Sequence, residues 1–180
     1  MSGLLNATLY LLNTLFLLYL WVLILRVLLQ LSRADSYNPI SQIIGQLTRY
    51  PVGSIQQVIP RWQRLDIAAC IYALLISWVY MQAIYAFLDQ PLSPSLGLWL
   101  AIRELAVQVL TVYSGCLFVY VLLSWVGPGM NNPVGSVLWS ICEPLLRPVR
   151  RVLPPYSGLD FSPLVVILLL QVARIILASM

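Results

Sequence analysis

The sequence contains no histidine and no lysine, and only 9% of its 180 residues are charged. The missing histidine removes the commonest general base and the commonest metal ligand. Because lysine is missing as well, no Ser-His, Cys-His or Ser-Lys arrangement can form. These absences argue against an enzyme.

Cysteine is also scarce. The chain has three cysteines, Cys70, Cys116 and Cys142, and no two of them form a CxxC pair. An odd number of cysteines cannot all pair within one chain. Cys70 and Cys116 lie inside apolar runs, where cysteine acts as a small buried hydrophobe. We therefore expect no metal site and no cofactor.

Charge is scarce because apolar residues make up 61% of the chain, whereas a soluble domain is about 45–50% apolar. A membrane-spanning helix needs ~20 mostly apolar residues. We predict four spans, over residues 5–31, 67–88, 105–126 and 161–178. The third span has an alternative start near Pro94, where Ser93 supplies a capping hydroxyl.

The arginines indicate how these spans are oriented. Two loops, over residues 32–66 and 127–160, hold Arg33, Arg49, Arg61, Arg64, Arg147, Arg150 and Arg151, whereas the opposite side has only Arg103. Arginine-rich loops stay in the cytoplasm. We therefore expect both loops to be cytoplasmic and both termini to face outward.

The chain matches itself at an offset of 94 residues. The matched pairs are Asn38-Pro39 with Asn132-Pro133, Val58 and Pro60 with Val152 and Pro154, and Leu65-Asp66 with Leu159-Asp160. Identities at one fixed offset indicate an internal duplication. We place the copies at residues 1–88 and 89–180. Each copy crosses the membrane twice, so the copies are parallel rather than inverted repeats.

Each loop begins with the same helix signal, an asparagine cap followed by proline at the first helical position. Apolar residues at helical spacing follow, which predicts short amphipathic interfacial helices over residues 38–48 and 132–146. Asp66 and Asp160 directly precede the next spans and fit as N-caps. Between the second short helix and its span, Pro144, Pro148 and Pro154 predict a stiff, extended segment.

The order of these motifs resembles the YggT/YlmG family of integral membrane proteins. The shared pattern is Asn-Pro, a short apolar helix, Pro-x-Arg-Arg-apolar-apolar-Pro, and then Asp opening a span. The residues that carry it include Asp35 to Pro39 and the arginine pair Arg150-Arg151, although Gln56-Gln57 replaces that pair in the first copy. The resemblance covers nearly the whole chain as two tandem copies.

The resemblance implies a multi-pass protein of the bacterial inner membrane without known catalysis. Relatives are linked with osmotic or ion homeostasis, with cell division or envelope organisation, and in plastids with cytochrome assembly and thylakoid or nucleoid distribution. The expected fold is all-α, with four transmembrane helices in two parallel repeats. Each repeat carries a short amphipathic interfacial helix in its cytoplasmic loop.

Loop arginines are the residues that we expect to meet a ligand. The candidates are Arg61, Arg64, Arg147, Arg150 and Arg151. Each could attract anionic lipid headgroups with about 1 kcal/mol, or an acidic surface of a protein partner. The simpler alternative is that they only keep the loops inside. Nucleic acid is not expected as a partner, because no recognisable binding motif accompanies the arginines.

Two arginines lie within the spans. Arg26 either snorkels to the cytoplasmic interface or pairs with Asp66 or Asp160, which have similar depth. Arg174 follows Asp160 by about 14 residues, or ~21 Å along a helix. It either snorkels to the outer interface or pairs with Glu104.

Gln108, Thr111 and Gly115 share one face of the third span. We interpret them as a packing seam between helices, with a water-lined polar path through Gln108 and Thr111 as the alternative. No carboxylate lies at the predicted middle of a span, which argues against an ion-coupled carrier acting alone.

From these features we predict a non-enzymatic interaction, assembly or membrane-organisation factor that acts through its basic cytoplasmic loops. Its expected partners are anionic lipid at the cytoplasmic face and an unidentified membrane or cytoplasmic protein, and homo-oligomerisation is compatible with the sequence. The alternative is a component of potassium or osmotic homeostasis, as an oligomeric channel or a channel modulator.

Overall fold

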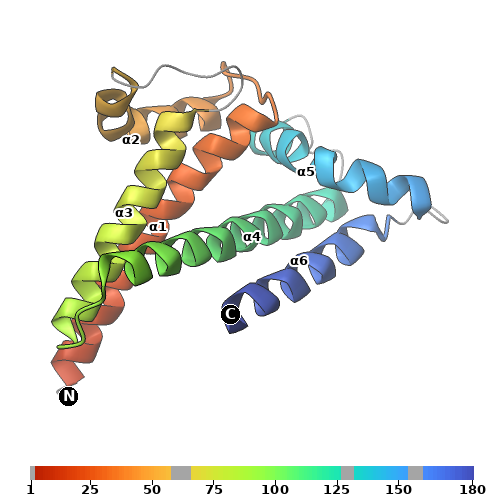
Figure 1. Ribbon diagram of the computed structural model, residues 1–180. Helices are drawn as coiled ribbons and strands as arrows, with labels where there is room; N and C mark the ends of the chain where they lie inside the picture. Colours follow the sequence, from red (N-terminus) through yellow and green to blue (C-terminus); the bar gives the residue numbers. More distant parts are fainter. Residues whose placement is uncertain (1–2, 58–65, 127–131, 154–159) are drawn as a thin grey trace.

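A computed structural model describes residues 3–57, 66–126, 132–153 and 160–180 of the chain. Within these residues the chain forms six helices (Figure 1). They are α1 (Gly3–Leu31), α2 (Pro39–Gln56), α3 (Ile67–Phe87), α4 (Pro94–Val126), α5 (Pro133–Val152) and α6 (Ser162–Ser179).

Four of these helices, α1, α3, α4 and α6, are long and apolar enough to cross a membrane. The α4 helix begins at Pro94, the earlier of the two starts considered, and the Leu96 N–H donates to Ser93 Oγ at 3.4 Å. With 33 residues α4 is ~50 Å long at 1.5 Å per residue. That exceeds the ~30 Å hydrocarbon layer, so α4 must tilt or project beyond it.

The helices form two hairpins. In the first, α1 packs on α3 with α2 across their ends, and in the second α4 packs on α6 with α5 in the corresponding place (Figure 1). The hairpins meet because α4 also contacts α1 and α3. We call the surface formed by α2 and α5 the loop face. The all-α fold with four spanning helices in two parallel repeats is therefore confirmed.

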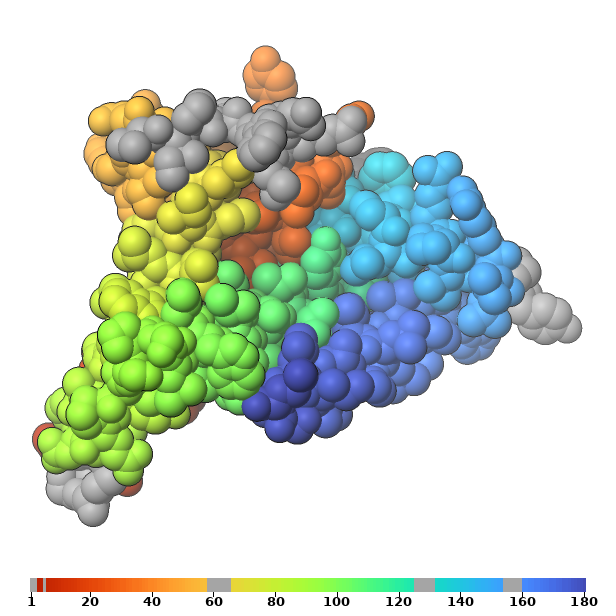
Figure 2. All heavy atoms as spheres, viewed as in Figure 1, coloured from red at the N-terminus to blue at the C-terminus, as the bar shows by residue number. Residues whose placement is uncertain are grey.

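The tightest packing lies near the loop face, where the two hairpins join. Leu20 and Leu23 of α1, Leu117 of α4 and Ile141 and Leu146 of α5 are at most 1% exposed. By contrast, the first half of α1 and most of α6 expose leucine and isoleucine side chains, and α6 forms an outer ridge of the second repeat (Figure 2). Such surfaces require lipid or another apolar neighbour.

The two asparagine caps lie as the sequence predicts. Asn38 Oδ1 accepts from the Ile40 N–H at 2.9 Å, and Asn132 Oδ1 accepts from the Gly135 N–H at 2.6 Å. The helices that they open are longer than predicted, with 18 residues in α2 and 20 in α5. In α2, Ile44 packs inward while Ile43 and Leu47 remain exposed.

The prediction of an extended segment after residue 143 is wrong where the chain is described, because α5 continues through Pro144 and Pro148 to Val152. A proline inside a helix removes one backbone hydrogen bond and frees a carbonyl. Both prolines are exposed, so on this outer side water can satisfy the freed groups. Pro60 and Pro154 lie outside the described residues.

Asn38 also joins the repeats. Its Nδ2 donates to the Pro133 backbone oxygen and to Ser136 Oγ, both at 2.8 Å. One amide thus caps α2 and binds the first turn of α5. Asn132 supplies the matched comparison, because it caps its own helix through a single bond to Gly135.

We predict that Asn38→Ala destabilises the protein more than Asn132→Ala. Each change removes a cap worth ~1 kcal/mol, but Asn38→Ala also removes the two bonds to α5, worth roughly 1 kcal/mol each. Unfolding by dodecyl sulfate in mixed micelles, followed by circular dichroism, measures both losses. Equal losses would show that the Asn38 bridge adds nothing.

Candidate functional site

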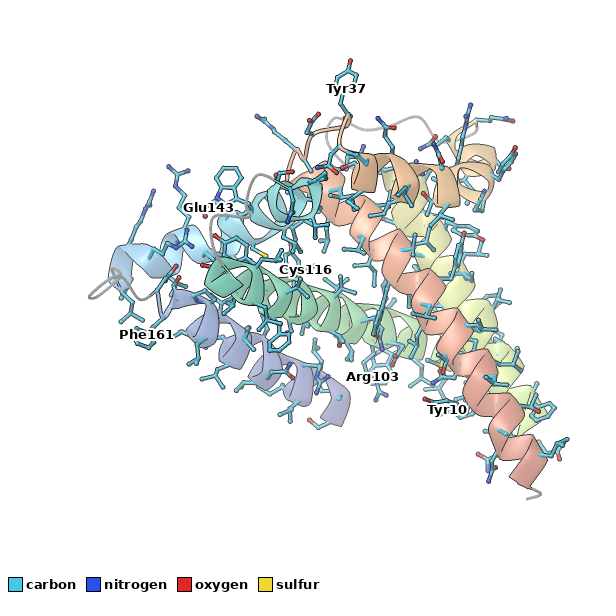
Figure 3. All side chains as sticks on the ribbon, turned by 180° about the vertical axis from the view of Figure 1, so that it is seen from behind. Tyr10, Tyr37, Arg103, Cys116, Glu143 and Phe161 are labelled. Carbon is cyan, nitrogen blue, oxygen red and sulfur yellow. The ribbon has the colours of Figure 1, made fainter. Side chains whose placement is uncertain are left out.

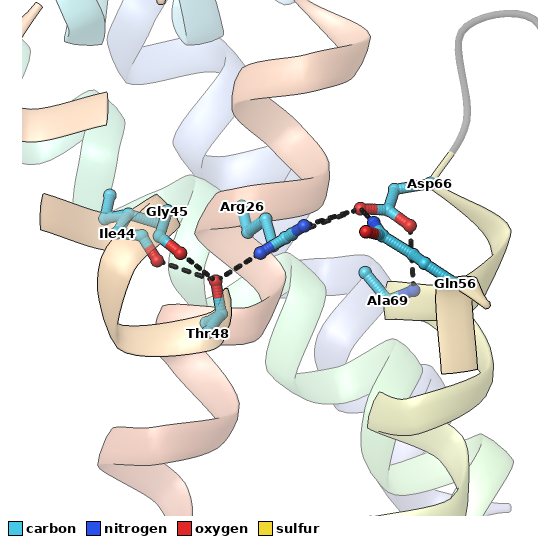
Figure 4. A network of polar contacts seen from close by, with 7 residues as sticks. All are labelled: Arg26, Ile44, Gly45, Thr48, Gln56, Asp66 and Ala69. Carbon is cyan, nitrogen blue, oxygen red and sulfur yellow. Dashed lines mark hydrogen bonds and ion pairs between the residues drawn. The ribbon is translucent and has the colours of Figure 1, made fainter. Parts of the chain in front are cut away.

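A polar cluster holds the start of α3 against α1 and α2 (Figure 4). Arg26 of α1 donates to Asp66 Oδ2 through Nη2 at 2.9 Å and Nε at 3.2 Å, and through Nη1 to Thr48 Oγ1 at 2.7 Å. Gln56 Nε2 donates to the same carboxylate oxygen at 2.8 Å. Of the two partners considered for Arg26, the structure shows Asp66.

Asp66 has a second task as the N-cap of α3, because its Oδ1 accepts from the Ala69 N–H at 3.2 Å. Its side chain is only 2% exposed, and that of Arg26 is 15% exposed. Burial alone would raise the pKa of the Asp66 carboxyl. Hydrogen bonds from Gln56 and Arg26, together with the charge of Arg26, outweigh burial and hold this pKa below the ordinary value of an aspartate carboxyl.

The second repeat contains a related cluster at the start of α6. Arg150 of α5 donates through Nε to Asp160 Oδ2 at 2.8 Å and through Nη1 to Glu143 Oε2 at 2.7 Å. Asp160 Oδ1 accepts from the N–H and the hydroxyl of Ser162. The side chains of this cluster are 26–30% exposed, so this cluster is more open than the first.

The two clusters differ in which helix supplies the arginine. At the offset of 94 residues, Asp66 corresponds to Asp160, Arg26 to Tyr120 and Gln56 to Arg150. The guanidinium therefore comes from the spanning helix in the first repeat and from the loop helix in the second. Burial alone would lower the pKa of Arg150, but Tyr120, Asp160 and Glu143 together raise it.

Thr48, which supports Arg26, corresponds to Cys142. Cys142 is fully buried and free, and burial together with the neighbouring Cys116 raises the pKa of its thiol to about 12. A thiol with this pKa stays protonated at neutral pH, so Cys142 acts as an apolar packing residue here.

The loop arginines predicted to bind a ligand divide into two kinds. Arg150 is engaged in the cluster of the second repeat, whereas Arg147 and Arg151 are exposed on α5 one helical turn apart. Arg61 and Arg64 lie outside the described residues. Ligand binding by these arginines stays a prediction.

Gln108 and Thr111, the proposed polar path, form hydrogen bonds within the protein. Gln108 Oε1 accepts from Trp21 Nε1 at 2.8 Å, and its Nε2 donates to Glu104 Oε1 at 2.7 Å. The Thr111 hydroxyl donates to the Val107 carbonyl of its own helix at 2.9 Å. This arrangement joins α1 to α4 and favours the packing-seam interpretation.

Arg174 forms no ion pair with Glu104 within the part of the chain that the structure describes. Its side chain instead lines a groove between α1, α4 and α6. Of the two interpretations of Arg174, the pairing with Glu104 is therefore wrong.

Sequence reasoning missed Thr48 and Trp21 as members of these networks, because neither shows a local motif. From the sequence, Gln56 stands out only because Gln56-Gln57 replaces the pair Arg150-Arg151, and its bond to Asp66 is not predicted. Its signal was available in the duplication, since a polar residue at position 56 and an arginine at position 26 replace Arg150 and Tyr120 together.

Two parallel hairpins, each with a loop helix and an aspartate at the start of its returning span, define a duplicated multi-pass membrane protein. The chain belongs to the CCB3/YggT family, because the sequence model of that family matches residues 5–88 and again residues 99–180. Both halves of the duplication are thus recognised separately.

Two bacterial relatives resemble this chain over most of its length, and a plant relative resembles it over about a third. The Pseudomonas aeruginosa protein PA0392 is 38% identical over 174 residues, covering 95% of this chain and 88% of that protein. Escherichia coli K12 YggT is 35% identical over 170 residues, covering 93% and 87%. YlmG homolog protein 1-1, a chloroplast protein of Arabidopsis thaliana, is 43% identical over 58 residues, covering 31% and 25%. No solved structure matches the chain.

We predict that the arginine of the first cluster can be moved to its place in the second. Arg26→Tyr leaves Asp66 buried without a guanidinium and costs about 3 kcal/mol or more. Adding Gln56→Arg recovers most of this loss, because the side chain at position 56 already reaches Asp66. Unfolding free energies in mixed micelles provide the measurement.

The matched control for this exchange is Arg26→Tyr with Gln57→Arg, which has the same net charge. Gln57 is exposed at the end of α2, and no described bond links it to Asp66. Equal rescue by arginine at position 56 and at position 57 would show that net charge, rather than the contact with Asp66, restores stability.

The lowered pKa of Asp66 predicts acid sensitivity. A carboxyl whose folded-state pKa lies below its unfolded value contributes stability that is complete above the unfolded value and is lost as the pH falls through the folded one. The wild type should therefore lose stability below about pH 4. Asp66→Asn should have a lower unfolding free energy at neutral pH, and that free energy should change less as the pH falls. Parallel pH curves for the two proteins would contradict the assignment.

Proposed function

We propose that this protein is a non-catalytic organiser of the bacterial inner membrane, which acts through a cytoplasmic loop face. The observation that carries the proposal is that the loop face combines exposed arginines with exposed aromatic and apolar side chains. Arg147 and Arg151 are exposed on α5, and Trp139 on the same helix is 49% exposed. This combination suits the boundary between lipid headgroups and water.

The first repeat contributes similar groups to the loop face. Tyr37 and Tyr50 are each 87% exposed, and Arg49 is exposed on α2 next to Tyr50. Figure 3 shows Tyr37 projecting away from the helices. Each arginine near an anionic leaflet adds about 1 kcal/mol of attraction. These side chains thus suit a surface that contacts both headgroups and a partner protein.

The polar side chain of Gln108 is already hydrogen-bonded within the protein, which supports a scaffold role over an ion-conducting role. The amide of Gln108 is held at both ends by Trp21 and Glu104, so it is not free to coordinate a passing ion. The rival function, potassium or osmotic homeostasis through an oligomeric channel, needs polar groups that line a continuous pathway.

Gentle extraction of the protein from its native membrane tests the proposal. We expect a stoichiometric protein partner to co-purify with the wild type and to be lost, by about tenfold or more, with the double change Arg147→Glu and Arg151→Glu. Arg103→Gln, which removes a charge from the half of α4 that is remote from α5, should leave the partner bound.

Two further measurements complete the test. Membrane-impermeant thiol reagents should label Arg49→Cys and Arg147→Cys only from the cytoplasmic side. Proteoliposomes should show no potassium flux above protein-free vesicles. A reproducible flux that disappears on changing Gln108 or Thr111 would instead establish the channel function.

A further inference from the structure

The half of the α4–α6 hairpin that is remote from α5 contains two arginines without a carboxylate partner among the described residues, Arg103 of α4 and Arg174 of α6. The guanidinium carbon of Arg103 lies 5.6 Å from the centre of the Trp99 ring, and the buried Nε of Arg103 has no hydrogen-bond partner among the described residues. Figure 3 shows it near the end of α4 that is remote from α5. Glu104 is nearby in sequence, but its carboxylate accepts from Gln108.

Arg174 lines an open groove of about 520 Å³ between α1, α4 and α6. Its neighbours along the groove include Leu17, Trp21, Val107 and Thr111. Arg103 is not one of the lining residues, but it precedes Val107 on α4 by four residues, about one helical turn, and so lies beside the groove. The groove therefore has apolar walls and positive charge but no carboxylate among its lining residues.

An arginine inside a membrane span is costly unless it meets water, a carboxylate or a phosphate. Arg174 follows Ser162, the first residue of α6, by twelve residues, or ~18 Å along the helix axis at 1.5 Å per residue. This distance places it toward the headgroups of the leaflet remote from the loop face. Next to it, Val172, Ile175 and Ile176 are 55–62% exposed, which offers an apolar surface to an acyl chain.

We propose that this groove binds one anionic phospholipid of the leaflet remote from the loop face. The lipid phosphate accepts hydrogen bonds from the Arg174 guanidinium, with Arg103 supplying a second positive charge from the same face of α4. The acyl chains lie against the exposed apolar side of α6. Charge complementarity selects the lipid, since a guanidinium pairs with a phosphate in a bidentate geometry.

The test uses the full-length protein in nanodiscs that mix phosphatidylcholine with phosphatidylglycerol. After transfer to mild detergent, native mass spectrometry counts the phosphatidylglycerol molecules that remain bound. The wild type should retain one, and Arg174→Gln should lower its retention about tenfold, which corresponds to ~1.4 kcal/mol. Arg174→Lys keeps the positive charge but cannot bind the phosphate in the bidentate geometry of a guanidinium, so it should lower the retention of phosphatidylglycerol less than Arg174→Gln does.

Arg33→Gln is the matched control, because it removes the same charge from the exposed segment between α1 and α2 and should leave this lipid bound. Added inorganic phosphate should not displace the lipid. Equal retention by Arg174→Gln and the wild type, or an equal loss with Arg33→Gln, would overturn the proposal. Displacement by free phosphate would also overturn it, by showing a site for a soluble anion.

Discussion

The fold depends on a buried aspartate at the point where the chain returns to the membrane. Lipid tails are as apolar as leucine, so apolar burial does not drive spanning helices together as it does in water. Hydrogen bonds between helices must supply much of the specificity. Asp66 does this by capping α3 while accepting from Arg26 of α1 and Gln56 of α2. One carboxylate therefore fixes three helices relative to one another.

The duplication has preserved this arrangement while exchanging its parts. Both repeats keep the aspartate and one guanidinium, but the arginine is on the spanning helix in the first repeat and on the loop helix in the second. Tyr120 and Gln56 stand at the corresponding positions of the other repeat. The first cluster is closed, whereas the second is partly open and includes Glu143 as well. The two loop helices consequently differ, and α5 is the one that displays the arginines Arg147 and Arg151.

The sequence predicted the spans, the duplication and the helix caps, because each of these depends on local chemistry. Charge-free runs define spans, and Asn38, Asn132 and Asp66 act through backbone groups two or three residues away. For Arg26 the sequence leaves three options, which are snorkelling and pairing with Asp66 or Asp160, since depth alone does not choose among them.

Other features depend on tertiary contacts and were not accessible from the sequence. Pro144 and Pro148 predict a stiff, extended segment, but α5 continues through both because their exposed position leaves the freed carbonyls to water. The exchange of arginine between helices was hidden, because position 26 and position 56 are thirty residues apart and each alone reads as an ordinary departure. The groove at Arg174 could not be predicted from the sequence, because it is formed by three helices, α1, α4 and α6, whose relative positions depend on tertiary packing.

A double-mutant cycle on Arg26 and Asp66 tests the central claim most directly. The unfolding free energies of Arg26→Gln, Asp66→Asn and the double variant, measured in one lipid–detergent mixture, give the coupling between the two side chains. We predict a favourable coupling of about 2–3 kcal/mol, larger than that between Arg150 and Asp160. A coupling near zero, with additive losses, would contradict the view that this ion pair holds the hairpin together.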